Sequence, residues 1–245
     1  MLGKEGFMVQ KKIICYRTEE KIRIDGFLNE RAWRLAARTE NFVDIVGGEQ
    51  LPLRKWVKVL WDDEYLYVGF HIESPDVWGT VVRQDDIVYN DPDAEIFIDP
   101  DGDTLNYYEF EVNALNTRYE VFWAKPYYDI ERKIWIDASE AGANFSWDLA
   151  GIKHAVQIYG TLNFHEDVDR GWSVKVALPW AGMRDLTRGS LPPKPGDIWR
   201  INFYCQEFRD WRKKEVDHYI WAPAGVVSCH VPSTWGYIEF SDKTV

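Results

Sequence analysis

The sequence has few of the features that mark an exported or membrane-bound protein. Its 245 residues include only three cysteines, Cys15, Cys205 and Cys229, which are widely spaced and form no C-x-x-C pair. No apolar run approaches the roughly 18 residues of a membrane span, and residues 1–12 lack the apolar stretch of a signal peptide. We therefore expect a cytoplasmic protein in a reducing compartment, or a secreted one if a leader has been removed.

Positive charge is also scarce. The chain has 29 Lys and Arg against 40 Asp and Glu, a net charge of −11 at pH 7, and its basic residues form no cluster. Such a charge opposes contact with phosphate backbones and anionic lipids, so we expect neither nucleic acid nor a membrane surface as a partner. The G-x-S-x-G, H-E-x-x-H and glycine-rich phosphate-loop motifs of common enzyme classes are missing as well.

Aromatic residues, in contrast, are abundant. The 13 Trp, 13 Tyr and 12 Phe make up 16% of the chain, while Gly and Pro are too sparse for a linker. Large β cores use many aromatic rings, and sugar-binding surfaces use flat rings against the apolar faces of pyranoses. The composition is compatible with both, and the length with a single domain over residues 1–245.

Alternation of apolar and polar residues dominates from residue 55 onward and predicts an all-β protein. One short helix is expected after Asn29, through Trp33 to Ala36. Many short strands separated by turns are typical of an antiparallel, jelly-roll-like β-sandwich. The irregular segment 125–151 is either a functional loop or an elaboration that covers a sheet edge. The predicted strands are a hairpin over 56–72 and segments 94–99, 106–114, 117–124, 152–160, 171–178, 198–208 and 234–240.

Two of these strands carry an unusual polar face. In the strand 106–114, alternation sends Tyr108, Phe110 and Val112 to one side, and Glu109, Glu111 and Asn113 to the other. In the partner strand 94–99, Glu95 points to the face away from the core positions Ile96 and Ile98. A hairpin that buries both apolar sets therefore places Glu95 and Glu111 on one face. The strand 198–208 repeats the pattern: Ile201 and Phe203 belong to its apolar face, and Tyr204 and Gln206 lie on its other face. This polar face is either the wet side of an ordinary sheet or a site for hydroxyl groups.

The turn Asp99-Pro-Asp101-Gly-Asp103 also has two interpretations. Three aspartates at alternate positions offer oxygen ligands to calcium. The same letters are a common way to turn a chain. No other cofactor is indicated.

Six segments, taken together, resemble the carbohydrate-binding module family 9-like group, which is related to DOMON domains. The resemblance implies a β-sandwich that binds glycans, in well-understood members at chain ends held between two tryptophans. It also implies structural calcium, without locating it. The segments, in family order, are IRIDGFLNERAW, VLWDDEYLYVGFHIESPDVW, DAEIFIDPDGD with YYEFEVNALNT, WSVKVALPW, PGDIWRINF and HVPSTWGYIEF.

The resemblance can be carried over residue by residue. The two clamp positions fall at Tyr89 and Cys229. Tyr89 keeps an aromatic ring, whereas Cys229 has none, and Trp221 or Trp78 could supply the missing ring. Glu95 and Asn113 occupy sugar-binding polar positions, whereas Glu111 stands where clamp-type members have a basic residue. Tyr204 and Gln206 lie on the corresponding inner strand, and His230 lies beside Cys229.

These observations predict a protein that binds a sugar or oligosaccharide without catalysis. The alternative is a glycoside hydrolase that uses Glu95 and Glu111 as a carboxylate pair. A third possibility is an interaction protein that contacts its partner through residues 125–151. The sequence does not determine the oligomeric state.

Overall fold

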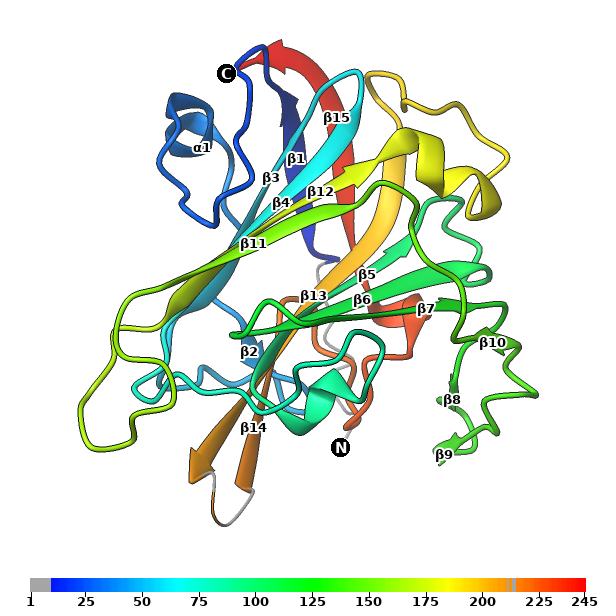
Figure 1. Ribbon diagram of the computed structural model, residues 1–245. Helices are drawn as coiled ribbons and strands as arrows, with labels where there is room; N and C mark the ends of the chain where they lie inside the picture. Colours follow the sequence, from blue (N-terminus) through cyan, green and yellow to red (C-terminus); the bar gives the residue numbers. More distant parts are fainter. Residues whose placement is uncertain (1–9, 211, 213–214) are drawn as a thin grey trace, which may run out of the picture.

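The computed structural model describes residues 10–210, 212 and 215–245, and shows two layers of strands packed face to face (Figure 1). One layer holds, in spatial order, β10 (Ala143–Asn144), β7 (Arg118–Trp123), β6 (Tyr107–Asn113), β5 (Asp93–Asp99) and β13 (Ile198–Asp210). The other holds β15 (Gly236–Thr244), β1 (Lys12–Arg17), β3 (Lys55–Trp61), β4 (Tyr65–Ile72), β12 (Trp172–Pro179) and β11 (Lys153–Ile158). The predicted β-sandwich is thus confirmed.

The two layers are connected through β13. Its first residues, from Ile198 to Ile201, pair with β15, and its later residues pair with β14 (Glu215–Ile220), which also contacts β2 (Val43–Asp44). Most pairs are antiparallel, as predicted, but β1 runs parallel to both of its neighbours, β15 and β3. The sheet is therefore mixed, because the N-terminal strand inserts between two strands that run in its own direction.

The main core lies between the layers. The rings of Phe70 on β4 and Phe203 on β13 meet edge to face with centroids 5.9 Å apart, which joins the two layers directly. Ile96 and Phe110 are fully buried in this core, as alternation predicts. Removal of these large apolar side chains from water is the main favourable contribution to folding.

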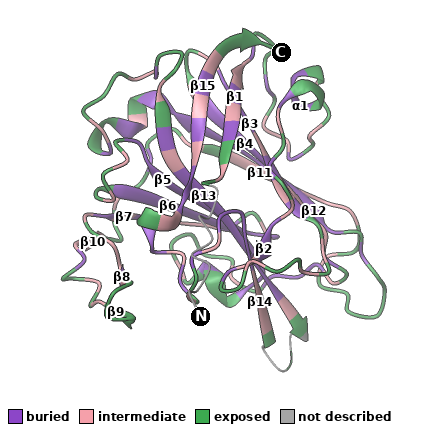
Figure 2. Cartoon of the chain, turned by 180° about the vertical axis from the view of Figure 1, so that it is seen from behind, coloured by how far each residue is buried: buried purple, intermediate pink, exposed green. Residues whose placement is uncertain are grey.

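The outer face of the first layer is also buried (Figure 2). Phe97, Tyr107 and Trp235 form the centre of a second apolar cluster there. Segments that follow β7 and β14 cover this face, so β5 and β6 are buried along their whole length. Although β5 and β6 alternate in sequence, neither strand therefore has an exposed side.

Part of the outer face of the second layer is covered by the short helix α1 (Arg31–Leu35), which buries Ala32 and Trp33 against Leu60, Tyr67 and Ala177. The helix was predicted, but Asn29 does not cap it. Glu30 occupies the N-cap position without a side-chain cap hydrogen bond, and the Glu20 carboxylate instead accepts the Ala32 N–H at 2.8 Å. The other helical elements of the described residues are short 3-10 segments: η1 (Val88–Asn90), η2 (Trp180–Asp185) and η3 (Pro232–Thr234).

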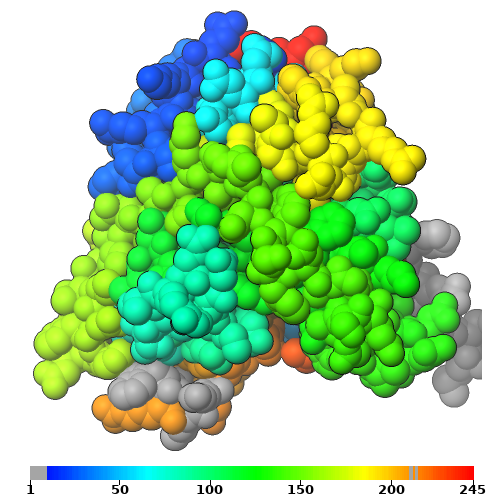
Figure 3. Space-filling view, turned by 45° about the vertical axis from the view of Figure 1, so that its right-hand side comes forward, coloured from blue at the N-terminus to red at the C-terminus, as the bar shows by residue number. Residues whose placement is uncertain are grey.

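The irregular segment 125–151 has little regular structure. It contains β8 (Tyr128–Asp129), β9 (Ile134–Trp135) and β10, and its green atoms project at the lower right of the space-filling view (Figure 3). β8 and β9 pair only with each other. The segment therefore extends the fold beyond the sandwich.

Within the described residues, none of the helices is long and apolar enough to cross a membrane. The expected localisation rests partly on residues 1–12, which lack the apolar stretch of a signal peptide. Of these, residues 1–9 lie outside the residues that the structure describes.

Two valines offer a matched test of the core. Val59 on β3 is fully buried, whereas Val168 is 82% exposed. Val59→Ala removes two buried methyl groups and leaves a small cavity, so we expect it to lower the free energy of unfolding by about 2 kcal/mol. Val168→Ala should change it by less than about 0.5 kcal/mol. Urea denaturation followed by circular dichroism measures both, and equal effects would contradict the assignment of the core.

Candidate functional site

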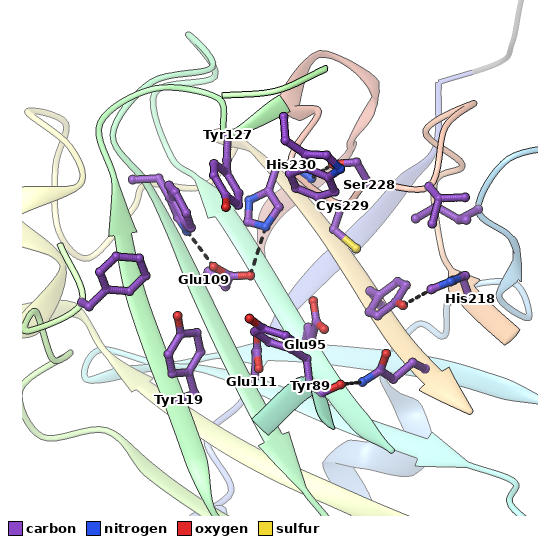
Figure 4. A pocket seen from close by; sticks show the side chains of 17 residues that line it. Tyr89, Glu95, Glu109, Glu111, Tyr119, Tyr127, His218, Ser228, Cys229 and His230 are labelled. Atoms are coloured by element: carbon purple, nitrogen blue, oxygen red, sulfur yellow. Dashed lines mark hydrogen bonds and ion pairs between the residues drawn. The ribbon is translucent and has the colours of Figure 1, made fainter. Parts of the chain in front are cut away.

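A cavity of about 400 Å³ opens on the outer face of the first layer, between β5, β6, β7 and β13 and the segments that cover them. Figure 4 shows its lining side chains. Its floor is formed by acidic side chains of β5 and β6, and one wall by aromatic rings of β7 and the segment after it. The opposite side is lined by β13, β14 and residues 227–230.

The acidic floor follows directly from strand register. Glu95 of β5 pairs with Glu111 of β6, and Glu109 lies two residues before Glu111 on the same face. All three carboxyl groups line the cavity, yet each residue is at most 5% exposed. The alternation that sends Ile96 to the core therefore sends these acids into the cavity.

Burial governs the charge of this floor. Removal from water raises the pKa of Glu95 and of Glu111 well above the usual range, and neighbouring carboxylates raise both further. Burial likewise raises the pKa of Glu109 to about 8, although the Trp123 Nε1–H donates a hydrogen bond to its carboxylate at 2.6 Å. Among the described residues that line the cavity, none is Lys or Arg.

His230 lies over Glu109. Its Nε2 is 3.4 Å from Glu109 Oε1, and its Nδ1 hydrogen-bonds the Tyr107 hydroxyl at 2.9 Å. Burial lowers the pKa of His230 to about 3, so the ring is neutral at pH 7. Because burial also favours the protonated Glu109, neither group supplies the charge that would stabilise the ionised form of the other.

The aromatic wall is built mostly from β7 and the segment after it. Trp123 and Tyr127 stack with centroids 4.4 Å apart, and the Trp135 ring meets Tyr127 edge to face at 5.0 Å. Trp135 and Phe145 are each 51% exposed, so both offer ring surface to a ligand. Such flat, partly exposed rings can contact the apolar face of a sugar ring.

Six of the predicted ligand-binding residues line this cavity together: Tyr89, Glu95, Glu111, Tyr204, Gln206 and His230. Tyr89, in η1, is 48% exposed and faces Tyr119. The Gln206 amide donates hydrogen bonds to the backbone carbonyls of Tyr89 and Asp91, so Gln206 fixes the segment that carries Tyr89. The Tyr204 hydroxyl hydrogen-bonds His218 Nδ1.

The structure does not bring the other two predicted residues to the cavity. Asn113 is fully buried and holds nearby turns: its amide donates to Val81 O at 2.8 Å, and its carbonyl accepts from Thr117 N at 3.0 Å. Trp221 is fully buried in the main core, where its Nε1–H donates to Glu40 at 2.9 Å. Trp78, the other suggested replacement ring, packs on Phe208 away from the cavity lining.

The three aspartates proposed for calcium close a turn instead. The Asp99 carboxylate accepts the N–H groups of Gly102 and Thr104, each at 2.8 Å. Asp101 accepts from the Thr187 hydroxyl, and Asp103 accepts the Leu105 N–H at 2.9 Å. Within the described ranges, these side chains do not form a group with ligand spacing, and the implied calcium does not fit here.

Several lining residues were not selected from the sequence. Glu109 lies on the polar face predicted for the strand 106–114, and Tyr119 and Trp123 lie on the predicted strand 117–124, so alternation could have identified them. Tyr127, Trp135 and Phe145 lie in the segment 125–151, whose lack of periodicity gave no signal. Cys229, at the lost clamp position, lines the cavity with its thiol; burial raises the pKa of that thiol well above its usual value.

Glu95 and Glu111 come together on the cavity floor, where one carboxylate oxygen of Glu95 lies within 4.8 Å of one of Glu111. Glycosidases use a pair of carboxyl groups roughly 5–10 Å apart. The glycosidase alternative stays a prediction.

His230 predicts a pH dependence of stability. Its pKa is about 3 in the folded protein and about 6.5 in the unfolded chain, so the unfolded state binds more protons between these values. The free energy of unfolding should fall as pH drops below about 6.5, by up to about 3 kcal/mol at pH 4 from this residue. Urea denaturation at pH 7 and pH 4 should show a smaller acid-induced loss in His230→Asn than in wild type. Parallel losses would contradict the buried neutral ring.

Comparison with known proteins identifies the family of this chain. The model of the carbohydrate family 9 binding domain-like family matches residues 24–242. A family 9 carbohydrate-binding module from Caldicellulosiruptor kristjanssonii is 17% identical; its complex with cellotriose gives a TM-score of 0.62 over 95% of each chain. Its complex with glucose gives 0.61 over 95% of this chain and 97% of that one.

A putative carbohydrate-binding protein from Bacteroides uniformis ATCC 8492 has the same fold, with 16% identity and a TM-score of 0.66 over 94% of this chain and 99% of that one. No curated protein matches the sequence. The solved structures support the sandwich, and the family match covers nearly all of the chain. The protein therefore belongs to the carbohydrate family 9 binding domain-like family.

Proposed function

We infer that this protein binds carbohydrate in the cavity on the outer face of the first layer. The observation that carries the inference is that one cavity combines exposed aromatic rings with buried polar groups. Family membership supports the same conclusion, as do the complexes of the Caldicellulosiruptor kristjanssonii module with cellotriose and glucose.

The two parts of the cavity have complementary tasks. The half-exposed rings of Trp135, Phe145 and Tyr89 contact the apolar C–H face of a sugar, where water is released from flat surfaces. Glu95 and Glu111 on the floor hydrogen-bond its hydroxyl groups: a carboxylate accepts, and a protonated carboxyl also donates. The volume of about 400 Å³ suits one or two sugar units.

The ring that the resemblance expects at Cys229 has its counterpart elsewhere in this cavity. The Trp135 ring lies 5.9 Å from the ring of His230, centroid to centroid. Because His230 follows Cys229 in sequence, an indole is available beside the clamp position that lacks a ring. In this proposal, Tyr89 and Trp135 are the two rings that hold the sugar. The segment 125–151 is then part of the binding site.

Two exposed phenylalanines provide a matched test. Phe145 lines the cavity and is 51% exposed, whereas Phe164 is 46% exposed and lies outside it. Isothermal titration with glucose and cellotriose should show binding that Phe145→Ala weakens about tenfold, because a ring contact contributes about 1–1.5 kcal/mol. Phe164→Ala should bind like wild type.

The polar floor has its own test. Glu95→Gln keeps the shape of the side chain but replaces one carboxyl oxygen with an amide NH₂ group, which removes a hydrogen-bond acceptor from the floor. We therefore expect at least fivefold weaker binding with circular dichroism unchanged. A glycan array extends the search beyond glucans. Failure of wild type to bind any glycan at millimolar concentration would contradict the proposed function, and unchanged affinity in both Phe145→Ala and Glu95→Gln would contradict the proposed site.

A further inference from the structure

The floor of the cavity concentrates acidic groups without a permanently charged base beside them. Glu95, Glu109 and Glu111 line it, and their side chains lie close together in Figure 4. The fully buried Asp93 does not line the cavity, but one of its oxygens lies within 4.8 Å of an oxygen of Glu95 and of one of Glu111. None of the described lining residues is Lys or Arg. Four acids therefore share a region whose described lining offers them no fixed positive charge.

Glu111 also has an unpaired acceptor on this floor. Its carboxyl group accepts a hydrogen bond from the Tyr89 N–H, but its Oε2 atom is buried and has no hydrogen-bond partner among the described residues. The residue is only 2% exposed, and it lines the cavity. Buried polar atoms are normally paired. A ligand that donates a hydrogen bond to Glu111 Oε2 therefore completes the floor.

Two other buried glutamates show how this fold compensates the charge of an acid. Glu207 contacts the fully buried Lys55 at 2.6 Å, and Glu120 contacts Arg118 at 2.7 Å. The two histidines that line the cavity cannot act in the same way, because burial lowers their pKa values and keeps both rings neutral at pH 7. The floor lacks this compensation, and a cationic ligand can supply it.

We propose that the cavity selects amino sugars, with the ammonium group of the ligand held by Glu111 and its neighbours on the floor. This inference rests on the proposed function, because the aromatic rings hold the sugar ring itself. An ammonium group carries a positive charge and donates three hydrogen bonds, so it can pair with Glu111 Oε2 and with a second carboxyl oxygen at once. Hydrogen bonds between charged groups are roughly twice as strong as neutral ones. A neutral sugar offers only a hydroxyl group at the same place.

The charge of the floor changes when such a ligand binds. In the empty cavity, burial and then the neighbouring carboxylates raise the pKa values of Glu95 and Glu111, because the ionised forms lose water and repel one another. A bound ammonium group favours the ionised form, so these carboxyl groups release protons to the solvent and form ion pairs with the ligand. The rings of Tyr89 and Tyr119, which meet edge to face at 6.5 Å and line the same cavity, also attract cations.

The test compares three sugars that differ only at C2. Glucosamine carries an ammonium group there, N-acetylglucosamine an uncharged amide, and glucose a hydroxyl group. Isothermal titration of the full chain at pH 7, with chelator present to remove metal ions, should show about tenfold tighter binding of glucosamine than of the other two. Equal affinity for the three sugars would overturn this inference and leave the proposed function intact. A protein that binds no glycan at all, amino sugars included, would contradict both.

Glu111→Gln tests the floor itself. The change keeps the shape of the side chain but removes its charge, so the preference for glucosamine over glucose should fall to about twofold or less. Glu109→Gln is a second variant with the same expected result, and its amide oxygen can still accept the hydrogen bond from Trp123. Circular dichroism checks that both variants fold.

Glu166→Gln is the matched control, because Glu166 is exposed and lies outside the cavity lining. It should keep the preference of wild type for glucosamine. The inference is overturned if both floor variants keep that preference. It is also overturned if Glu166→Gln loses the preference to the same extent, because the net negative charge of the chain would then explain the attraction.

Discussion

The register between β5 and β6 is the constraint on which the cavity depends. Pairing Ile96 with Phe110 places both in the core and pairs Glu95 with Glu111 on the opposite face. Since side chains alternate with a period of two, a slip of either strand by one residue would exchange the apolar and acidic sets. The hydrophobic effect that drives core formation therefore also holds the acids at the cavity floor.

Burial on both faces gives this layer its chemistry. In a sheet with one wet face, the same glutamates would be hydrated and ionised at neutral pH. Here the covering segments bury them, and burial shifts the pKa values of acids upward and that of His230 downward. The covering segments also supply the rings of Tyr127 and Trp135, so the same residues that exclude water form the contact surface.

Much of this arrangement could be predicted from the sequence, because it follows from alternation. The core faces of the strands and the facing of Glu95 and Glu111 within one hairpin need only a period of two. The grouping of Tyr204 and Gln206 with them also requires that β13 pairs with β5. The parallel insertion of β1 could not be predicted, since strand order depends on contacts between distant segments. The part of the aromatic wall that Tyr127, Trp135 and Phe145 form could not be predicted either, because segment 125–151 has no period. Asn113 and Trp221 lie outside the cavity lining, where they hydrogen-bond Val81 and Glu40, which are remote from them in sequence.

The long strand β13 has a consequence for how the cavity responds to a ligand. Because it pairs with β15 in one layer and with β5 and β14 in the other, its separation would expose both the main core and the cavity lining. The strands that form the floor are thus part of the same cooperative unit as the core. A ligand meets a preformed floor and does not bear the entropic cost of ordering it, which leaves more of the contact free energy for affinity.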